Sequence, residues 1–411
     1  MRIALFTNEY PPNVYGGAGV HVEYLSRELA RADAGAHRVD VLCFGDQREA
    51  HGNLRVRGIA APATIPAQDV RHTRLLDALA RNLAMAGAAE SPDIVHCHTW
   101  YAHLAGCLAR PLTGARLVLT THSLEPHRPW KVEQLGTAYH ATTWVERTAY
   151  ENADGVVAVS EAMKADVQAL YGVAPERVRV IHNGIDPDEY RRREAPATLR
   201  RLGVNPDVPF VLFVGRITRQ KGILHLVRAI RHLPAGSQVV LCAGAPDTQA
   251  IAVEMAVAVD EARRDASGDV VWIAEMLPKE DVIALYSHAA VFVCPSVYEP
   301  FGIINLEAMA CETPVVASAV GGIPEIVEPG VTGTLVALEA EGGGSAEPRD
   351  PEAFSRALAA AIADLLGDDA RREAMGKAAR ARVLERFSWR RIAELTLAFY
   401  RDVAAGPPAG G

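Results

Sequence analysis

The sequence lacks the long apolar run that a membrane-spanning helix requires. Its longest stretch without a formal charge, Val282 to Tyr298, contains serines, a histidine and a proline, whereas a spanning helix needs about 20 mainly apolar residues. The N-terminal run Met1 to Thr7 is short and β-like, without the apolar core of a signal peptide. We therefore expect a cytoplasmic protein without a membrane partner.

Cysteine is scarce, and basic charge is not concentrated. The 6 cysteines form no Cys-x-x-Cys pair and mostly lie inside apolar runs, which is typical of buried reduced thiols. The 42 basic and 50 acidic residues give a net charge of −8 without a long Lys/Arg stripe. A disulfide scaffold is excluded, and no nucleic-acid partner is expected.

Several common catalytic motifs are also missing. The chain has neither a G-x-x-x-x-G-K-[ST] motif nor a G-x-S-x-G elbow, which disfavours P-loop NTPases and α/β-hydrolases. His96 and His98 lie two residues apart on a predicted strand, so both imidazoles project from one face, as metal ligands would. A carboxylate or third histidine held nearby would be needed to complete a site. We predict no metal or cofactor, and we interpret the two histidines as strand-end packing or substrate contacts.

Short apolar runs alternate with helical patterns along all 411 residues, a length that suits two or three domains. Continuous apolar runs indicate strands buried on both faces of a parallel sheet. We therefore predict an α/β protein with two doubly wound Rossmann-like domains. The predicted strands are 3–6, 39–44, 94–97, 117–120, 155–159, 178–181, 210–214, 239–242, 270–273, 291–294 and 314–317.

The domain boundary is placed in the charged, proline-containing stretch Asp186 to Pro209. We predict a first domain over 1–188 and a second over 189–388, with a C-terminal helix over 389–405 that packs back on the first. Residues 341–348 have the composition of a mobile surface loop, and 406–411 that of a frayed tail.

Two loops that follow predicted strands suit a phosphate ligand. Tyr15 to Gly19 is a glycine-rich turn before a helix, where free amides and the helix dipole favour an anion. A plain tight turn is the alternative. Gly215 to Gly222 carries Arg216 and Lys221, which could neutralise a diphosphate or simply form a solvated basic turn.

Three further motifs follow later strands of the two predicted domains. Glu299 ends a loop, Gly302 opens a helix, and Glu307 lies inside that otherwise apolar helix, where an unpaired carboxylate is costly. Carboxylates accept hydrogen bonds from sugar hydroxyls. His122 ends another strand and is either a substrate contact or a hydrogen-bonded loop histidine. The Gly321-Gly322 turn is either part of the same site or conformational.

Taken together, these motifs resemble the retaining glycosyltransferases of family four, which have the GT-B fold. The resemblance rests on E-P-F-G-x-x-x-x-E at 299–307, G-R-x-x-x-x-K at 215–221 and His-Asn-Gly-Ile-Asp at 182–186. The segments 8–12, 15–21 and 121–131 look like the actinobacterial glycogen synthase group, understood as α-maltose-1-phosphate synthases. Such enzymes move glucose from ADP-glucose to α-glucose 1-phosphate, without a metal ion.

The resemblance implies a role for each candidate residue. Arg216 and Lys221 would hold the donor diphosphate, and Glu299 would bind the hydroxyls of the donor sugar. The other implied contacts are Glu307 with ribose, the amides of Gly302, Ile303 and Ile304 with sugar and phosphate, Gly16 and Gly17 with the diphosphate, His122 with the donor glucose, and Glu9 with the sugar site. His127, Arg128 and Lys131 would bind an acceptor phosphate or form a solvated loop.

One departure bears on the acceptor. Longer bacterial glycogen synthases have Lys-x-Gly-Gly-Leu in the first loop, whereas this chain has Val14-Tyr15-Gly16-Gly17-Ala18. The missing lysine favours a small acceptor over a growing polymer. The alternatives are an α-1,4-glucan synthase, a transferase to an inositol phosphate, and, from other classes, a nucleotide-sugar epimerase or a non-catalytic sugar-nucleotide sensor. A glucan partner and a homodimer stay open.

Overall fold

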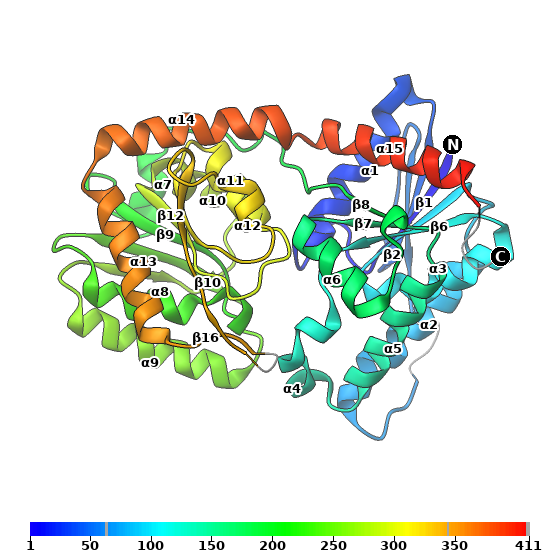
Figure 1. The fold of residues 1–411 in the computed structure, drawn as a ribbon, viewed down its shortest axis with the longest axis horizontal. Coiled ribbons are helices and arrows are strands. Elements are labelled where there is room, and N and C mark those ends of the chain that lie inside the picture. The colour runs from blue at the N-terminus through cyan, green and yellow to red at the C-terminus, as the bar shows by residue number, and fades with distance from the viewer. Residues whose placement is uncertain (62–64, 343–344, 408–411) are drawn as a thin grey trace. The chain divides into compact units, whose positions relative to one another are not determined.

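The computed structural model describes residues 1–61, 65–342 and 345–407, and the chain forms two compact units (Figure 1). The first comprises Met1–Gly184 and Trp389–Gly411, and the second comprises Ile185–Ser388. The two α/β units with mainly parallel sheets confirm the predicted fold class. Within the described residues, every helix is too short or too polar to cross a bilayer.

The first unit is built on an eight-stranded sheet in the order β3-β4-β2-β1-β5-β6-β7-β8. All neighbouring strands are parallel except the antiparallel pair β3 and β4. The strands are β1 (Arg2–Phe6), β2 (Arg38–Phe44), β3 (Arg48–His51), β4 (Leu54–Ile59), β5 (Ile94–His98), β6 (Arg116–Thr121), β7 (Gly155–Ala158) and β8 (Val178–Val180). The helices are α1 (Gly17–Gly35), α2 (Thr73–Gly87), α3 (Trp100–Thr113), α4 (Val132–Leu135), α5 (Ala138–Asn152), α6 (Glu161–Tyr171) and α15 (Trp389–Ala405).

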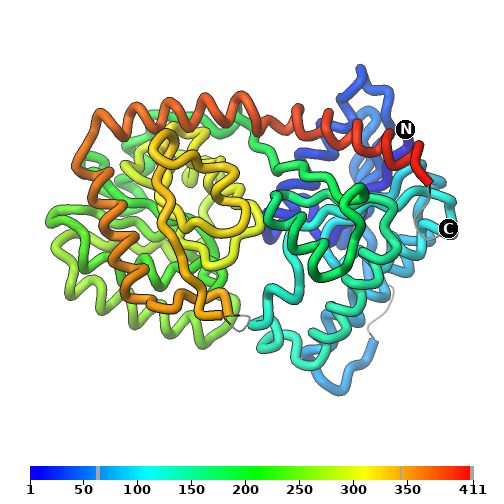
Figure 2. Tube along the Cα trace, in the orientation of Figure 1, coloured from blue at the N-terminus to red at the C-terminus, as the bar shows by residue number. Residues whose placement is uncertain are grey.

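The last helix, α15, lies along α1 within the first unit (Figure 2). Trp389 stacks on Tyr24 of α1 with ring centroids 5.7 Å apart. Tyr400 is fully buried in the same core cluster as Ile3 of β1. Burying one large apolar side chain contributes about 1.5–3 kcal/mol. These contacts hold the end of the chain against its beginning.

The second unit contains a six-stranded parallel sheet in the order β11-β10-β9-β12-β13-β14. Its strands are β9 (Phe210–Arg216), β10 (Gln238–Gly244), β11 (Val270–Ile273), β12 (Val291–Cys294), β13 (Val315–Ser318) and β14 (Gly333–Val336). Its helices are α7 (Pro196–Arg201), α8 (Ile223–Ala229), α9 (Gln249–Asp265), α10 (Lys279–His288), α11 (Ile303–Ala310), α12 (Ile323–Ile326), α13 (Pro351–Leu366) and α14 (Asp369–Arg386). Its core joins the strands to α8, α9 and α13.

Two expectations from the sequence need correction or fall outside the structure. Within the predicted loop 341–348, the described residues belong to two strands, because β15 (Ala340–Gly342) and β16 (Ser345–Pro348) pair antiparallel. Backbone hydrogen bonds join these two strands although their composition gives little sign of a strand. Most of the predicted tail, 408–411, lies outside the described residues.

The strand order reverses near the centre of each sheet, and this indicates where a ligand is expected. β1 lies between β2 and β5, and β9 lies between β10 and β12. In open parallel sheets, ligands bind beyond the carboxyl ends of the strands at such a reversal. The loops after β1, β5, β9 and β12 are therefore the first places to look for a site.

Candidate functional site

Glu9 follows β1 and organises the first glycine loop. Its Oε2 accepts hydrogen bonds from the backbone N–H groups of Tyr15 at 2.8 Å and Gly16 at 2.7 Å. A Cβ placed on Gly19 would lie only 2.9 Å from the Glu9 side chain, so glycine there lets α1 begin beside the carboxylate. Glu9 therefore holds the loop that is expected to cover the donor diphosphate, and the Gly16 N–H is already bonded to its carboxylate.

His122 follows β6 and contacts a second histidine at the end of β5. Its Nε2 lies 3.0 Å from His98 Nδ1, which is hydrogen-bonding distance. Burial lowers the pKa of both rings well below the ordinary histidine value, so both are neutral at pH 7. His122 Nε2 is thereby engaged within the first unit. The sequence analysis did not predict this pair.

His96, by contrast, is saturated by structural hydrogen bonds. Its Nδ1 lies 2.6 Å from the Tyr400 hydroxyl and its Nε2 lies 2.7 Å from Thr120 Oγ1. The ring is fully buried and joins β5 to α15. Of the two interpretations left open for His96, these contacts favour strand packing over a substrate contact.

The three basic candidates near His122 all contact carboxylates. Lys131 Nζ donates to Glu125 Oε1 at 2.9 Å, and Arg128 lies 3.7 Å from the same carboxylate. His127 lies 3.3 Å from Asp166. Burial lowers the pKa of Lys131. Local carboxylates thus offset this positive charge, and an acceptor-phosphate role for these residues stays a prediction.

In the second unit, Lys221 and Glu299 form an ion pair beside the reversal of strand order. Lys221 follows β9 and Glu299 follows β12, and Lys221 Nζ donates to Glu299 Oε2 at 2.7 Å. Ser296 Oγ donates to the same oxygen at 3.1 Å. Although burial opposes the ammonium charge, the Glu299 carboxylate raises the pKa of Lys221. Lys221 is therefore a cation at neutral pH.

Arg216 is the last residue of β9 and is also paired. Its Nη1 donates to Asp247 Oδ1 at 2.7 Å, and both side chains are partly exposed. The carboxylate lies in the loop after β10, so the pair spans two adjacent strand ends. Arg216 is held by this contact and presents a guanidinium suited to phosphate oxygens.

Glu307 lies inside α11 and accepts a hydrogen bond from the Tyr286 hydroxyl of α10 at 2.9 Å. Burial raises the pKa of Glu307. The predicted cost of an unpaired carboxylate is thus partly offset by a neighbouring hydroxyl.

The first turn of α11 presents backbone amides and one unpaired side chain. Gly302 caps the helix with φ of 104°, a backbone conformation that favours glycine. The amides of Ile303 and Ile304 lie in the first turn, where no intrahelical acceptor is available. Asn305 is fully buried, and neither its Nδ2 nor its Oδ1 has a partner within the described residues. Asn305 was not among the predicted site residues, although a polar amide side chain in an otherwise apolar helix could have indicated a ligand contact.

The Gly321-Gly322 turn holds Glu299 in place. Gly321 has φ of +53°, and a Cβ there would lie 1.9 Å from the Glu299 carbonyl oxygen. The Gly322 N–H donates to that carbonyl at 3.0 Å. The turn is therefore both conformational and in direct contact with the candidate site.

Comparison with known proteins supports a transferase. Residues 15–189 match the family described as Glycosyltransferase Family 4, and residues 195–382 match Glycosyl transferases group 1. The chain is 48% identical to the Mycolicibacterium smegmatis "Alpha-maltose-1-phosphate synthase", with 98% of this chain and 100% of that protein covered. It is 32% identical to the Mycobacterium tuberculosis "Glycogen synthase", over 99% and 96% of the two chains.

A solved structure agrees with these relatives. The sucrose-phosphate synthase of Thermosynechococcus elongatus has 28% sequence identity and a TM-score of 0.77, with 98% of this chain and 99% of that chain covered. Three observations point to the same family. They are the two-unit architecture, the glycosyltransferase family models matched in each unit, and the identity over nearly the full length. The chain belongs to the family-four glycosyltransferases of the GT-B fold.

Proposed function

We propose that this chain is a retaining glucosyltransferase that moves glucose from ADP-glucose to α-glucose 1-phosphate and forms α-maltose 1-phosphate for α-glucan synthesis. The observation that carries the proposal is the Lys221–Glu299 pair beside Glu307 and the α11 amides, because it combines a cation for phosphate with acceptors for sugar hydroxyls. The printed name of the 48% identical relative supports the product.

The proposed reaction exchanges one bond at the glucose C1 atom. The bond from C1 to the diphosphate oxygen breaks, and a bond to the 4-hydroxyl oxygen of glucose 1-phosphate forms on the same face. The hydroxyl proton passes to the departing phosphate oxygen, so the products are ADP and α-maltose 1-phosphate. This route needs no separate carboxylate base. The protein must instead stabilise the negative charge that develops on the leaving diphosphate.

The charges on Lys221 and Arg216 suit that demand. Within the described residues, both recorded hydrogen bonds of the Glu299 carboxylate end on Oε2, which leaves Oε1 to accept from a glucose hydroxyl. Lys221 has three N–H donors, so it can keep its bond to Glu299 and still donate to a phosphate oxygen. Glu307 is proposed to accept from the ribose hydroxyls.

The first unit is proposed to supply the remaining contacts. His122 is assigned to the glucose, Glu9 to shaping the sugar site, and the Gly16–Gly17 loop to the diphosphate. His127, Arg128 and Lys131 are assigned to the acceptor phosphate, which would have to compete with Glu125 and Asp166 for them.

A product assay tests the proposal directly. ADP-glucose or UDP-glucose is offered with either α-glucose 1-phosphate or glycogen, and products are identified by mass. We expect a disaccharide phosphate from ADP-glucose and glucose 1-phosphate. Glycogen extension without any disaccharide phosphate would instead support the glycogen synthase alternative, which the 32% identical relative favours. Donor turnover without acceptor would indicate an epimerase, and binding without turnover would indicate a sensor.

Two variants test the residue assignments. Lys221→Ala and Glu307→Ala should each lower turnover of the donor at least about tenfold, or about 1.4 kcal/mol in activation free energy. Kinetics like those of the parent chain in either folded variant would remove that residue from the site.

A further inference from the structure

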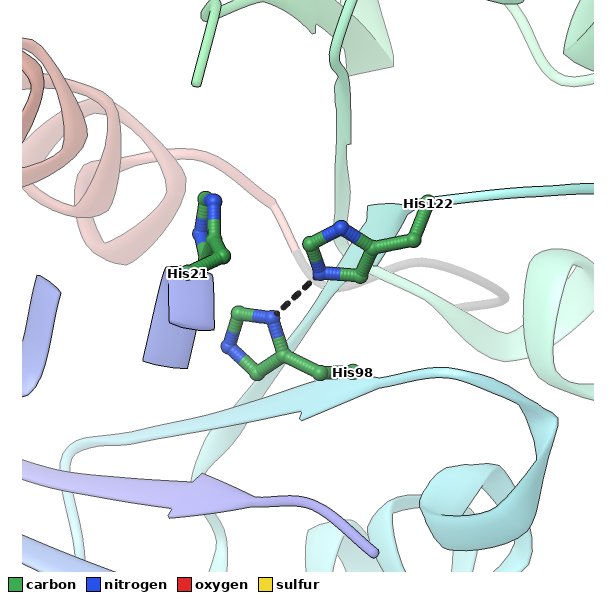
Figure 3. A group of neighbouring side chains, drawn as sticks. All are labelled: His21, His98 and His122. Atoms are coloured by element: carbon green, nitrogen blue, oxygen red, sulfur yellow. Dashed lines mark hydrogen bonds between the residues drawn. The ribbon is translucent and has the colours of Figure 1, made fainter. Parts of the chain in front are cut away.

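Three histidines of the first unit gather at the ends of its central strands. His21 lies in the first turns of α1, His98 ends β5 and His122 follows β6 (Figure 3). One ring nitrogen from each lies within 4.8 Å of the others. A metal site at His96 and His98 was expected to need a carboxylate or a third histidine nearby. His96 is instead bonded to Tyr400 and Thr120, whereas His98 has His21 and His122 beside it.

The ring of His21 offers a bare lone pair. Its Nδ1 lies 2.6 Å from the Asn183 amide oxygen, so in the neutral ring this nitrogen carries the hydrogen and Nε2 does not. His21 Nε2 is buried without a partner within the described residues. Buried polar atoms are rarely left unpaired in native proteins. A metal ion that binds the His21 Nε2 lone pair would remove this deficit.

All three rings are in the protonation state that binds metals. Burial lowers the pKa of His21 to about 4 and lowers the pKa of His98 and His122 well below their usual range. Neutral imidazole is a ligand for Zn²⁺ and similar ions. No proton has to leave the site when such an ion binds.

The spacing is close to that of a tetrahedral centre. Zn–N bonds of about 2.0–2.1 Å place neighbouring ligand nitrogens about 3.3 Å apart. His98 Nδ1 and His122 Nε2 are already 3.0 Å apart. The shared hydrogen would shift to the other nitrogen of its ring, and the third nitrogen, within 4.8 Å, needs to approach by about 1.5 Å. His122 is partly exposed, so it can move and admit an ion.

We propose that His21, His98 and His122 bind one Zn²⁺ ion, with water or an anion at the fourth position. Three protein ligands leave a position open. Zinc binding would also occupy His122, and, resting on the proposed function, we expect zinc to inhibit glucosyl transfer and an added chelator to restore it.

Binding is measured first without any sugar substrate. The full chain is stripped with EDTA and titrated with Zn²⁺ against a chromophoric chelator. We expect one ion per chain with Kd below about 10 µM, and a loss of affinity of at least about tenfold in His21→Gln and in His98→Gln. The matched control is His51→Gln, which replaces an exposed histidine on β3 and should bind zinc like the parent chain. Weaker binding by the parent chain, or equal effects of all three variants, would overturn the site.

A second measurement does not depend on the variants folding. X-ray absorption at the zinc edge of the one-to-one complex should show three imidazole ligands, and fewer than three would overturn the proposal. The failure of the proposed function is distinguishable, because a chain that binds zinc in this way but forms no disaccharide phosphate keeps the metal site and loses the reaction.

Discussion

Breaking the Lys221–Glu299 pair should destabilise the second unit strongly. The two side chains are only 18% and 8% exposed, so Lys221→Met leaves a buried carboxylate without its cation. Removing one partner of a buried pair costs about 3–5 kcal/mol. For a unit of this size, each kcal/mol shifts the midpoint by about 2–4 °C. The transition of the second unit should therefore fall by roughly 6 °C or more.

The assay is scanning calorimetry of the parent chain, Lys221→Met, Glu299→Gln and the double variant. The double variant should recover at least half of the loss, because neither partner then carries an uncompensated charge. The matched control is Lys377→Met, which breaks an exposed pair with Glu373 on α14; it should leave the midpoint within experimental scatter. Additive single effects, or a Lys221→Met shift no larger than the control, would refute the reasoning.

The remaining predictions concern the support of the site and the pH dependence of stability. Gly321→Ala should lower both donor turnover and the unfolding midpoint of the second unit, because its Cβ would overlap the Glu299 carbonyl. Gly330 also has a positive φ but has open space around it, so Gly330→Ala should lower stability alone. Equal donor turnover in the two variants would contradict this. Burial raises the pKa of Glu146, so the folded state favours its protonated form. The stability that this protonated form contributes is complete below the unfolded-state pKa of 4.5 and is lost as pH rises toward the folded-state pKa. Glu146→Gln should therefore flatten the fall in the unfolding midpoint that calorimetry records between pH 5 and 8. A variant whose midpoint falls with pH like that of the parent chain would contradict the predicted direction.

Most of the architecture was predictable, because its physical cause is local. The continuous apolar runs of β1 and β9 indicate strands buried on both faces, and each predicted run became a strand. β3 and β4 were missed because they lack such a run: β3 is fully exposed at the sheet edge, and β4, beside it, carries Arg55 and Arg57 between its apolar residues. β14, at the edge of the second sheet, was also missed. Strands at or next to a sheet edge need little apolar sequence, so composition does not reveal them.

The candidate residues were predictable only as separate loops. Glu299 meets Lys221 because β12 lies beside β9. Neither segment's own sequence indicates which strand is its neighbour. The same holds for Asp247 beside Arg216 and for the three-histidine cluster. His21 was passed over because, on sequence alone, it is one polar residue in an amphipathic helix.

The most direct test of the central claim is a crystal structure of the chain with bound ADP-glucose. The account predicts diphosphate oxygens within about 3 Å of the Lys221 ammonium and the Arg216 guanidinium, with ribose hydroxyls on the Glu307 carboxylate. Nucleotide density away from all three side chains would contradict it.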